Sequence, residues 1–259
     1  MTTRTRFAGI AFLMVFTLAA LWRGDVAARQ ASQTPTGVVA PPGRAARVPP
    51  AGQTATRLQD GRWLLVGGEG AEADASLWDP QTNVTTPTAT HLQLPRAWHT
   101  ATVLADGTVL VAAGRIGDTF VEVPELFDPA TQTFTLLAIP GAAARASHTA
   151  TLLTDGRVLI AGGTNGGNVA PPTEIWDLQA RTVTSVGPVG DASRAGHTAT
   201  LLPDGSVRLS GGRQLDGAPA ADDVIIDAER GTIVQAPRPS ADERIAPVVA
   251  GSIPASECP

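Results

Sequence analysis

RASHTATLLTDGRVLIAGG, residues 145–163, is one of four copies of a single pattern in this chain. The same pattern occurs as RAWHTATVLADGTVLVAAG at 96–114 and as RAGHTATLLPDGSVRLSGG at 194–212. A worn copy, QTATRLQDGRWLLVGG, occupies 53–68. The histidines of the three full copies, His99, His148 and His197, lie 49 residues apart. A fixed period of this length indicates a repeat architecture.

Each copy predicts four short antiparallel strands. The first strand alternates apolar and β-branched residues, and an Asp-Gly pair, the favoured two-residue hairpin signal, leads to a second strand such as 157–161. A variable loop leads to a third strand such as 173–176, and a turn at Asp177 leads to a fourth, 182–186. Four strands in about 50 residues are typical of a propeller blade. We therefore expect an all-β fold, a β-propeller or propeller arc of four four-stranded blades, at about 50–95, 96–144, 145–193 and 194–243.

The repeats resemble the kelch family. One mark is the double glycine that ends the second strand, with Ala113-Gly114 as a degenerate copy in the second repeat. Another is the aromatic residue before the aspartate of the third strand, as at Trp176, with Ile226 in its place in the fourth repeat. The second kelch aromatic, seven residues further on, is kept only at Phe134. The resemblance implies a kelch-type β-propeller but says little about function, because one fold hosts many functions. The double glycines are Gly67, Gly68, Gly162, Gly163, Gly211 and Gly212.

The regions outside the repeats predict export. Residues 1–28 combine two arginines, an apolar run at 7–22 and small residues before a cleavage site, as a bacterial signal peptide does. The alternative is an uncleaved membrane anchor, although 16 apolar residues are fewer than the roughly 20 that span a bilayer. Residues 29–49 read as a disordered linker. We expect the protein in the periplasm, on the cell surface or secreted.

The segment 244–259 keeps only the start of the pattern. Arg244 is in register with Arg96, Arg145 and Arg194, but Pro247 stands where histidine stood. This tail resembles the opening strand of bacterial immunoglobulin-like domains, and the alternative is a strand that closes the ring.

The repeated histidines and arginines have a structural and a functional interpretation. Three imidazoles at one blade position suit a zinc or copper site. Recurrence in every blade instead favours packing, with each histidine bonded to the backbone of a neighbouring blade. The arginines suit either buried carbonyls between blades or an anion or sugar. We predict structural roles for both sets and no metal site.

Turn chemistry accounts for the aspartates and glycines. The Asp-Gly pairs lack the alternating acidic residues of a calcium loop. The double glycines lack the lysine and the following helix of a phosphate loop, because the chain has no lysine. Close backbone approach or positive φ is the expected reason for these glycines.

The loops between second and third strands are the part that does not repeat. They span about 69–75, 115–121, 164–172 and 213–222. Propeller loops of this kind gather on one face, and loops on a rigid scaffold often carry binding. We expect them to recognise a polar ligand, either carbohydrate or protein. The candidate residues are Glu69, Glu72, Asp74, Arg115, Asp118, Asn165, Asn168, Arg213, Asp216 and Asp222.

Composition narrows the function. A formal net charge of -5 without a basic patch disfavours nucleic acid as a partner. The chain has no tyrosine, which excludes the copper radical chemistry of kelch-like oxidases resembling galactose oxidase and the tyrosine nucleophile of sialidases. The single cysteine, Cys258, lies outside the repeats.

We therefore predict a non-catalytic binding or scaffold module with no cofactor. The alternatives are a carbohydrate-active enzyme that uses loop carboxylates and a fragment of a larger surface protein. Four blades stand at the lower limit for a closed propeller, so either the four close into a small ring or missing sequence or a partner chain completes the arc.

Overall fold

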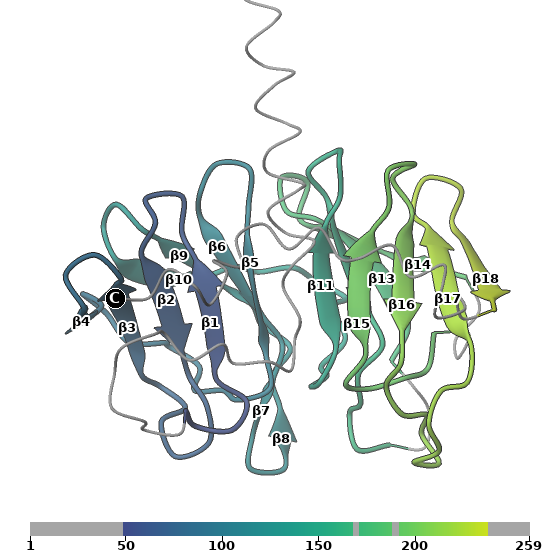
Figure 1. The fold of residues 1–259 in the computed structure, drawn as a ribbon, viewed down its shortest axis with the longest axis horizontal. Coiled ribbons are helices and arrows are strands. Elements are labelled where there is room, and N and C mark those ends of the chain that lie inside the picture. The colour runs from purple at the N-terminus through teal and green to yellow at the C-terminus, as the bar shows by residue number, and fades with distance from the viewer. Residues whose placement is uncertain (1–48, 168–170, 188–191, 238–259) are drawn as a thin grey trace, which may run out of the picture.

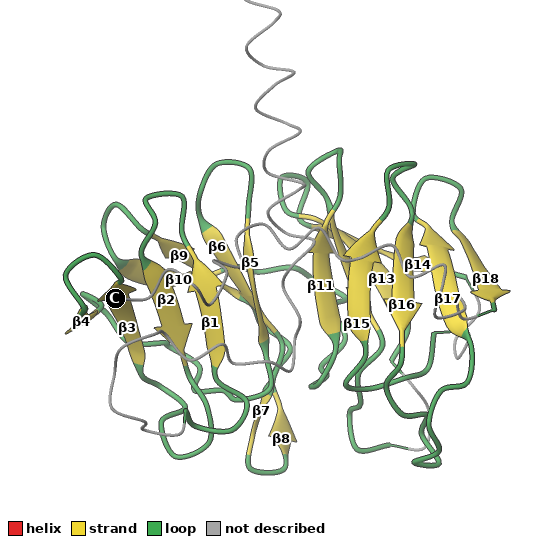
Figure 2. Cartoon of the chain, viewed as in Figure 1, coloured by secondary structure: helices red, strands yellow, loops and turns green. Residues whose placement is uncertain are grey.

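The computed structural model describes residues 49–167, 171–187 and 192–237. The predicted signal peptide, the tail 244–259 and all but the last residue of the linker lie outside the described residues. Strands, turns and loops make up the described part of the chain (Figure 2). None of its segments is a helix long and apolar enough to cross a membrane.

The described residues form four four-stranded antiparallel sheets, one for each repeat, and one small two-stranded sheet. The prediction of an all-β fold with four four-stranded blades is therefore confirmed. Blade 1 consists of β1 (Thr54–Arg57), β2 (Trp63–Val66), β3 (Ala75–Asp79) and β4 (Val84–Pro87); blade 2 of β5 (Thr100–Val103), β6 (Val109–Ala112), β9 (Glu125–Asp128) and β10 (Thr133–Leu136); blade 3 of β11 (Thr149–Leu152), β12 (Val158–Ala161), β13 (Thr173–Asp177) and β14 (Thr182–Val186); blade 4 of β15 (Thr198–Leu201), β16 (Val207–Ser210), β17 (Asp223–Asp227) and β18 (Thr232–Ala236).

The blades are arranged as an open arc. Figure 1 shows the first strands β1, β5, β11 and β15 following one another along the inside, with β4 and β18 at opposite ends. Neighbouring inner strands are in contact: β1 with β5, β5 with β11, and β11 with β15. Between described residues, no hydrogen bond joins blade 4 back to blade 1.

Three separate hydrophobic cores hold the arc together, one at each junction between blades. Leu64 and Val66 of blade 1 pack with Val109 and Phe127 of blade 2. The opposite face of blade 2 packs on blade 3, and the opposite face of blade 3 packs on blade 4. Both faces of a middle blade are thus buried, which explains why β6 and β12 are buried at every position.

Aspartates shape the turn between the first and second strands and the turn between the third and fourth strands of every blade. In the β1–β2 hairpin, Asp60 accepts a hydrogen bond from the backbone N–H of Arg62 at 2.9 Å, and the same bond recurs in blades 2, 3 and 4. At the β3–β4 turn, Asp79 accepts from Gln81 N–H at 2.8 Å, again with equivalents in every blade. These side chains satisfy turn amides, as Asx turns do.

One loop differs from the expectation. The segment 115–121 was predicted as a loop, but it contains a small hairpin of β7 (Arg115–Ile116) and β8 (Thr119–Phe120). Gly117 adopts a φ of 55° there, which permits the tight turn. The hairpin projects at the bottom of Figure 1, on the face where the loops between second and third strands lie.

Candidate functional site

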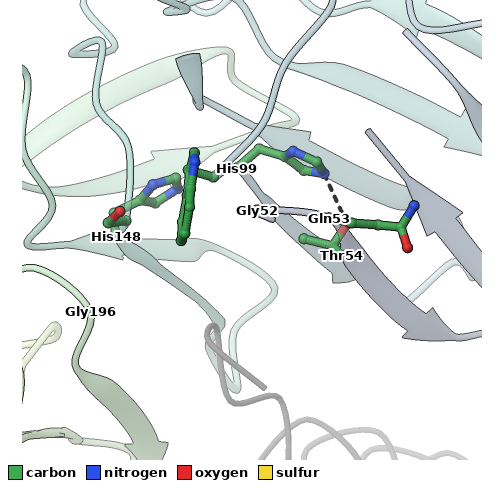
Figure 3. A pocket seen from close by; sticks show the side chains of 8 residues that line it. Gly52, Gln53, Thr54, His99, His148 and Gly196 are labelled. Carbon is green, nitrogen blue, oxygen red and sulfur yellow. Dashed lines mark hydrogen bonds between the residues drawn. The ribbon is translucent and has the colours of Figure 1, made fainter. Parts of the chain in front are cut away.

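The repeated histidines join neighbouring blades. His99 Nε2 lies 2.9 Å from Thr54 Oγ1 of the preceding blade, as Figure 3 shows. His148 contacts Thr100 at 3.0 Å, and His197 contacts Thr149 at 2.9 Å, in the same way. The partner is thus a threonine hydroxyl of the neighbouring blade, whereas the sequence led us to expect its backbone.

Burial keeps these rings neutral. It lowers the pKa of His99 to about 3, and the nearby Arg96 guanidinium lowers it further. Burial and Arg194 likewise lower the pKa of His197 to about 3. The pKa of His148 falls well below its usual value, first through burial and then through Arg145.

In the described part of the chain, no group of three or more His, Cys, Asp or Glu side chains is placed to hold a metal ion. Each Nε2 already contacts a threonine. Their role in this structure is to bond one blade to the next.

The repeated arginines are buried within their own blades. Arg96, fully buried, lies 2.9 Å from Glu125 and donates to the carbonyl oxygens of Leu94, Ala113 and Val123. Ala113 and Val123 belong to the arginine's own blade, whereas Leu94 lies in the segment that joins blade 1 to blade 2, so the expectation of carbonyls between blades holds for one of the three. The glutamate, which the sequence did not single out, also accepts two loop amides, those of Gln93 and Leu94.

Blade 3 repeats this pair and blade 4 does not. Arg145 lies 3.1 Å from Glu174, whose pKa burial raises against the opposing effect of the arginine. In blade 4 the register of Glu174 is taken by Val224, and Arg194 donates to backbone carbonyls, including that of Asp222 at 2.9 Å.

The double glycines lie where blades meet most closely. Gly67 has a φ of 59°, and a side chain there would overlap the backbone oxygen of Arg96. The following glycine position donates its N–H to the next blade: Gly114 to Arg145 O at 2.7 Å and Gly163 to Arg194 O at 2.8 Å. Positive φ and close approach thus favour glycine at these positions, although blade 2 has Ala113 at the first of them, with a φ of 52°.

Two of the candidate loop residues meet across the first two blades. Arg115, at the start of β7, forms an ion pair with Glu69 of the first loop at 3.0 Å, although they are 46 residues apart in sequence. Trp98 joins them, because its indole N–H donates to the same Glu69 oxygen at 2.9 Å. The three residues form one cluster that is open to solvent, since Glu69 and Arg115 keep about a half and a third of their side-chain surface exposed.

Trp98 occupies an unusual backbone conformation. Its φ is 59°, in the left-handed region that bulky residues rarely adopt. The same repeat position holds Gly52, Ser147 and Gly196, all with positive φ. At this position the amides form a ladder: Trp98 N–H donates to Gly52 O, Ser147 N–H to Trp98 O, and Gly196 N–H to Ser147 O, at 2.9 to 3.1 Å.

This ladder surrounds a small axial cavity. Its lining includes Gln53, Trp98, Ser147 and the imidazole of His148, and its volume is about 20 Å³. That volume holds about one water molecule. A ligand larger than a water molecule is therefore too large for this cavity.

Most other candidate residues serve their own loops. Glu72 accepts from Gly70 N–H, Asn165 from Gly167 N–H, and Asp216 from Ala218 N–H. Arg213 donates to Gly217 O at 2.8 Å, and Asp118 lies in the turn between β7 and β8.

Three candidates remain. Asp74 lies 4.0 Å from His91 in an exposed pair. Asp222 lines a second, more open cavity of about 370 Å³ at blade 4, together with Asp216 and Arg194. Asn168 lies outside the described residues.

Sequence reasoning missed Trp98. The signal was present, because the residue before Gln53 and the residue before His197 are both glycine. A tryptophan at that register departs from the backbone requirement of the repeat. Strained backbone of this kind clusters at binding sites.

Comparison with known proteins supports the fold. No family model matches the chain, and no curated protein matches it significantly. A solved structure of YjhT superposes with a TM-score of 0.60 at 16% identity, covering 76% of this chain and 68% of YjhT. A fungal alcohol oxidase of the AA5 family, in complex with copper, superposes with a TM-score of 0.48 at 17% identity over 73% of this chain. The chain spans about half of that oxidase, 53%. The likeness to YjhT shows a propeller-type fold.

Proposed function

We propose that this chain is a non-catalytic binding module of an exported, kelch-type protein, and that it recognises a polar ligand through the face that carries the Glu69–Arg115–Trp98 cluster. Carbohydrate is the class of ligand that this cluster suits best. The observation that carries the proposal is the placement of a partly exposed tryptophan in strained backbone beside a charged pair.

The chemistry of the cluster supports a sugar. An indole offers a flat apolar surface and a polar edge, and aromatic side chains of this kind are favoured at binding surfaces. The carboxylate accepts hydrogen bonds and the guanidinium donates them. A sugar hydroxyl can therefore donate to the first or accept from the second. Glu69 holds both Trp98 and Arg115, which fixes the three side chains before the ligand arrives.

The same geometry argues against loop carboxylates as a catalytic pair. Hydrolysis of a glycosidic bond requires two carboxyl groups facing one another across the bond. Glu69 instead contacts a guanidinium and an indole, and Glu72 and Asp216 accept amides of their own turns. These loop carboxylates therefore support a binding role.

A glycan array probed with the purified protein tests the proposal, followed by titration of the best sugar and a hydrolysis assay. The decisive variant is Trp98→Gly, because glycine occupies the same backbone position in blades 1 and 4 and tolerates its φ. We expect it to weaken binding at least tenfold, which is about 1.4 kcal/mol. Asp155→Asn, in a hairpin at the opposite end of the strands, is the matched control and leaves binding unchanged.

Binding that Trp98→Gly leaves intact would place the site elsewhere on the protein. Turnover of a bound sugar would overturn the non-catalytic assignment. An array with no bound sugar would exclude carbohydrate as the ligand.

A further inference from the structure

Each pair of neighbouring blades is joined by hydrogen bonds in which the earlier blade supplies one group and the later blade supplies the other. At the two ends of the arc, one end carries the first set of groups and the other end carries the second. Three kinds of hydrogen bond recur between neighbouring inner strands: the amide ladder through positions such as Gly52 and Trp98, the pair of threonine with histidine, and a threonine hydroxyl that donates to the next blade's carbonyl. The last of these joins Thr56 to Ala101 O at 3.2 Å and Thr102 to Ala150 O at 3.4 Å. Among the described residues the first two kinds occur at all three junctions, and the third occurs between blades 1 and 2 and between blades 2 and 3.

Blade 1 presents the groups that the later blade of each pair supplies to these bonds. The N–H of Gly52, at the ladder position, has no hydrogen-bond partner among the described residues. Gln53 replaces histidine, and its Nε2 donates to Gly67 O at 3.2 Å, which fixes the amide group. The carbonyl of Ala55 stands at the register of Ala101 and Ala150.

Blade 4 presents the groups that the earlier blade of each pair supplies to these bonds. The carbonyl of Gly196 is the last rung of the ladder within the described part. Thr198 stands at the register of Thr54, Thr100 and Thr149, and its hydroxyl donates only within its own blade, to Ser210 O at 3.3 Å. Thr200 is exposed, whereas its counterparts Thr56 and Thr102 are buried.

The sheet faces at these ends also lack a neighbouring blade. On blade 1, the partly exposed Trp63 and Leu65 stand at the registers of Val109 and Val111, which are fully buried against the preceding blade. On blade 4, Arg208 stands where blade 3 has the buried Leu159. A guanidinium opposite an indole is a favourable pair.

We propose that a second copy of this chain closes the arc, with blade 1 of each copy docked on blade 4 of the other. Two arcs of four blades then form one ring of eight, within the size range of propellers, and the twofold symmetry of the pair closes it without free ends. In each junction Gly52 N–H donates to Gly196 O, Thr198 pairs with the Gln53 amide, and Thr200 donates to Ala55 O.

A second copy fits better than the tail of the same chain. Pro247, at the register of the histidines, has neither a side-chain hydrogen-bonding group nor a backbone N–H. Gln53 keeps both. The glutamine therefore reproduces the pairing with threonine that the proline cannot make.

Chemical cross-linking tests which chain occupies the end of the arc. In a Cys258→Ser background, Gln53→Cys and Thr198→Cys are made singly and are then mixed, and a short bis-maleimide is added. We expect the mixture to give a covalent dimer and each single variant alone to give at least tenfold less. The double variant must give cross-linked dimers rather than an internally cross-linked monomer.

Light scattering after size exclusion measures the same contact without cysteines. The wild-type protein must have twice the mass of one chain, and Thr200→Asp, at the exposed end of the arc, must shift it to a single chain whose melting temperature matches that of wild-type protein diluted until it is a single chain. Thr131→Asp, in an exposed turn, is the matched control and stays dimeric. An internally cross-linked monomer, a wild-type monomer, or the absence of any cross-link would overturn the proposal.

Discussion

Replacing Thr100 by valine should destabilise the protein through a residue in the next blade. The substitution removes the hydroxyl that lies 3.0 Å from His148 Nε2 and keeps the β-branched shape that suits a strand. Both residues are buried, with 8% and 1% of their surface exposed, so bulk solvent does not reach the lost partner's position. The Nδ1 atom of His148 has no hydrogen-bond partner among the described residues, so the contact of Nε2 with Thr100 is the hydrogen bond that the ring loses.

The magnitude follows from leaving a buried polar atom without a partner, which costs about 1–3 kcal/mol. We expect the upper half of this range, because the whole imidazole is then unsatisfied. For a folded unit of this size each kcal/mol lowers the melting temperature by about 2–4 °C. Thr149→Val should behave in the same way, through His197.

The repeat supplies its own control. Thr198→Val removes a hydroxyl at the same strand position, with the same bond to its own blade that Thr149 makes, but without a histidine partner. Urea unfolding followed by tryptophan fluorescence measures all three variants, at a protein concentration low enough to keep single arcs apart. If Thr198→Val costs as much as Thr100→Val, the histidine contact adds nothing and the reasoning fails.

Three further predictions concern the buried repeat positions. Glu125→Gln should cost about 3–5 kcal/mol in unfolding free energy because it leaves Arg96 charged and buried, whereas Asp155→Asn at an exposed pair should cost at most about 1 kcal/mol; equal losses would refute the role of burial. Gly162→Ala should lower the melting temperature far more than Gly156→Ala, since only the first meets neighbouring atoms, and a comparable loss in both would contradict this. The folded pKa is about 3 for His99 and His197 and lies well below 6.5 for His148, so the stabilisation from these neutral rings is complete above pH 6.5. It declines as the pH falls below 6.5, by up to about 1.4 kcal/mol per pH unit for each histidine. Urea unfolding at pH 7.5, 6 and 5 measures this slope, and a flat profile would show that the rings become charged without unfolding.

Strand order and turns could be predicted from the sequence because their causes are local. An Asp-Gly pair specifies a hairpin from two adjacent residues, and the alternation of apolar and polar residues that marks a strand can be seen within about six residues. Contacts between blades could not be predicted in the same way. The partner of His148 is Thr100, 48 residues earlier, and nothing in the sequence around the histidine distinguishes a hydroxyl from a carbonyl.

Part of the candidate site was predictable and part was not. The loops between second and third strands were chosen because they vary, and two of their residues, Glu69 and Arg115, do meet. Most of the remaining loop side chains satisfy amides or carbonyls of their own turns, which short polar residues in loops commonly do. Composition cannot separate these two uses, because both require the same residue types.

Comparison of the blades with one another separates what builds the fold from what departs from it. At the ladder position the backbone requires positive φ, so glycine satisfies it at no steric cost, and Trp98 is the costly substitution. At the position of the buried glutamate, Val224 breaks a pair that blades 2 and 3 keep. A residue that departs from what its repeat position favours does not stabilise the blade that carries it. Trp98 is partly exposed beside the Glu69–Arg115 pair, whereas Val224 is fully buried, so Trp98 is the departure that a ligand can reach.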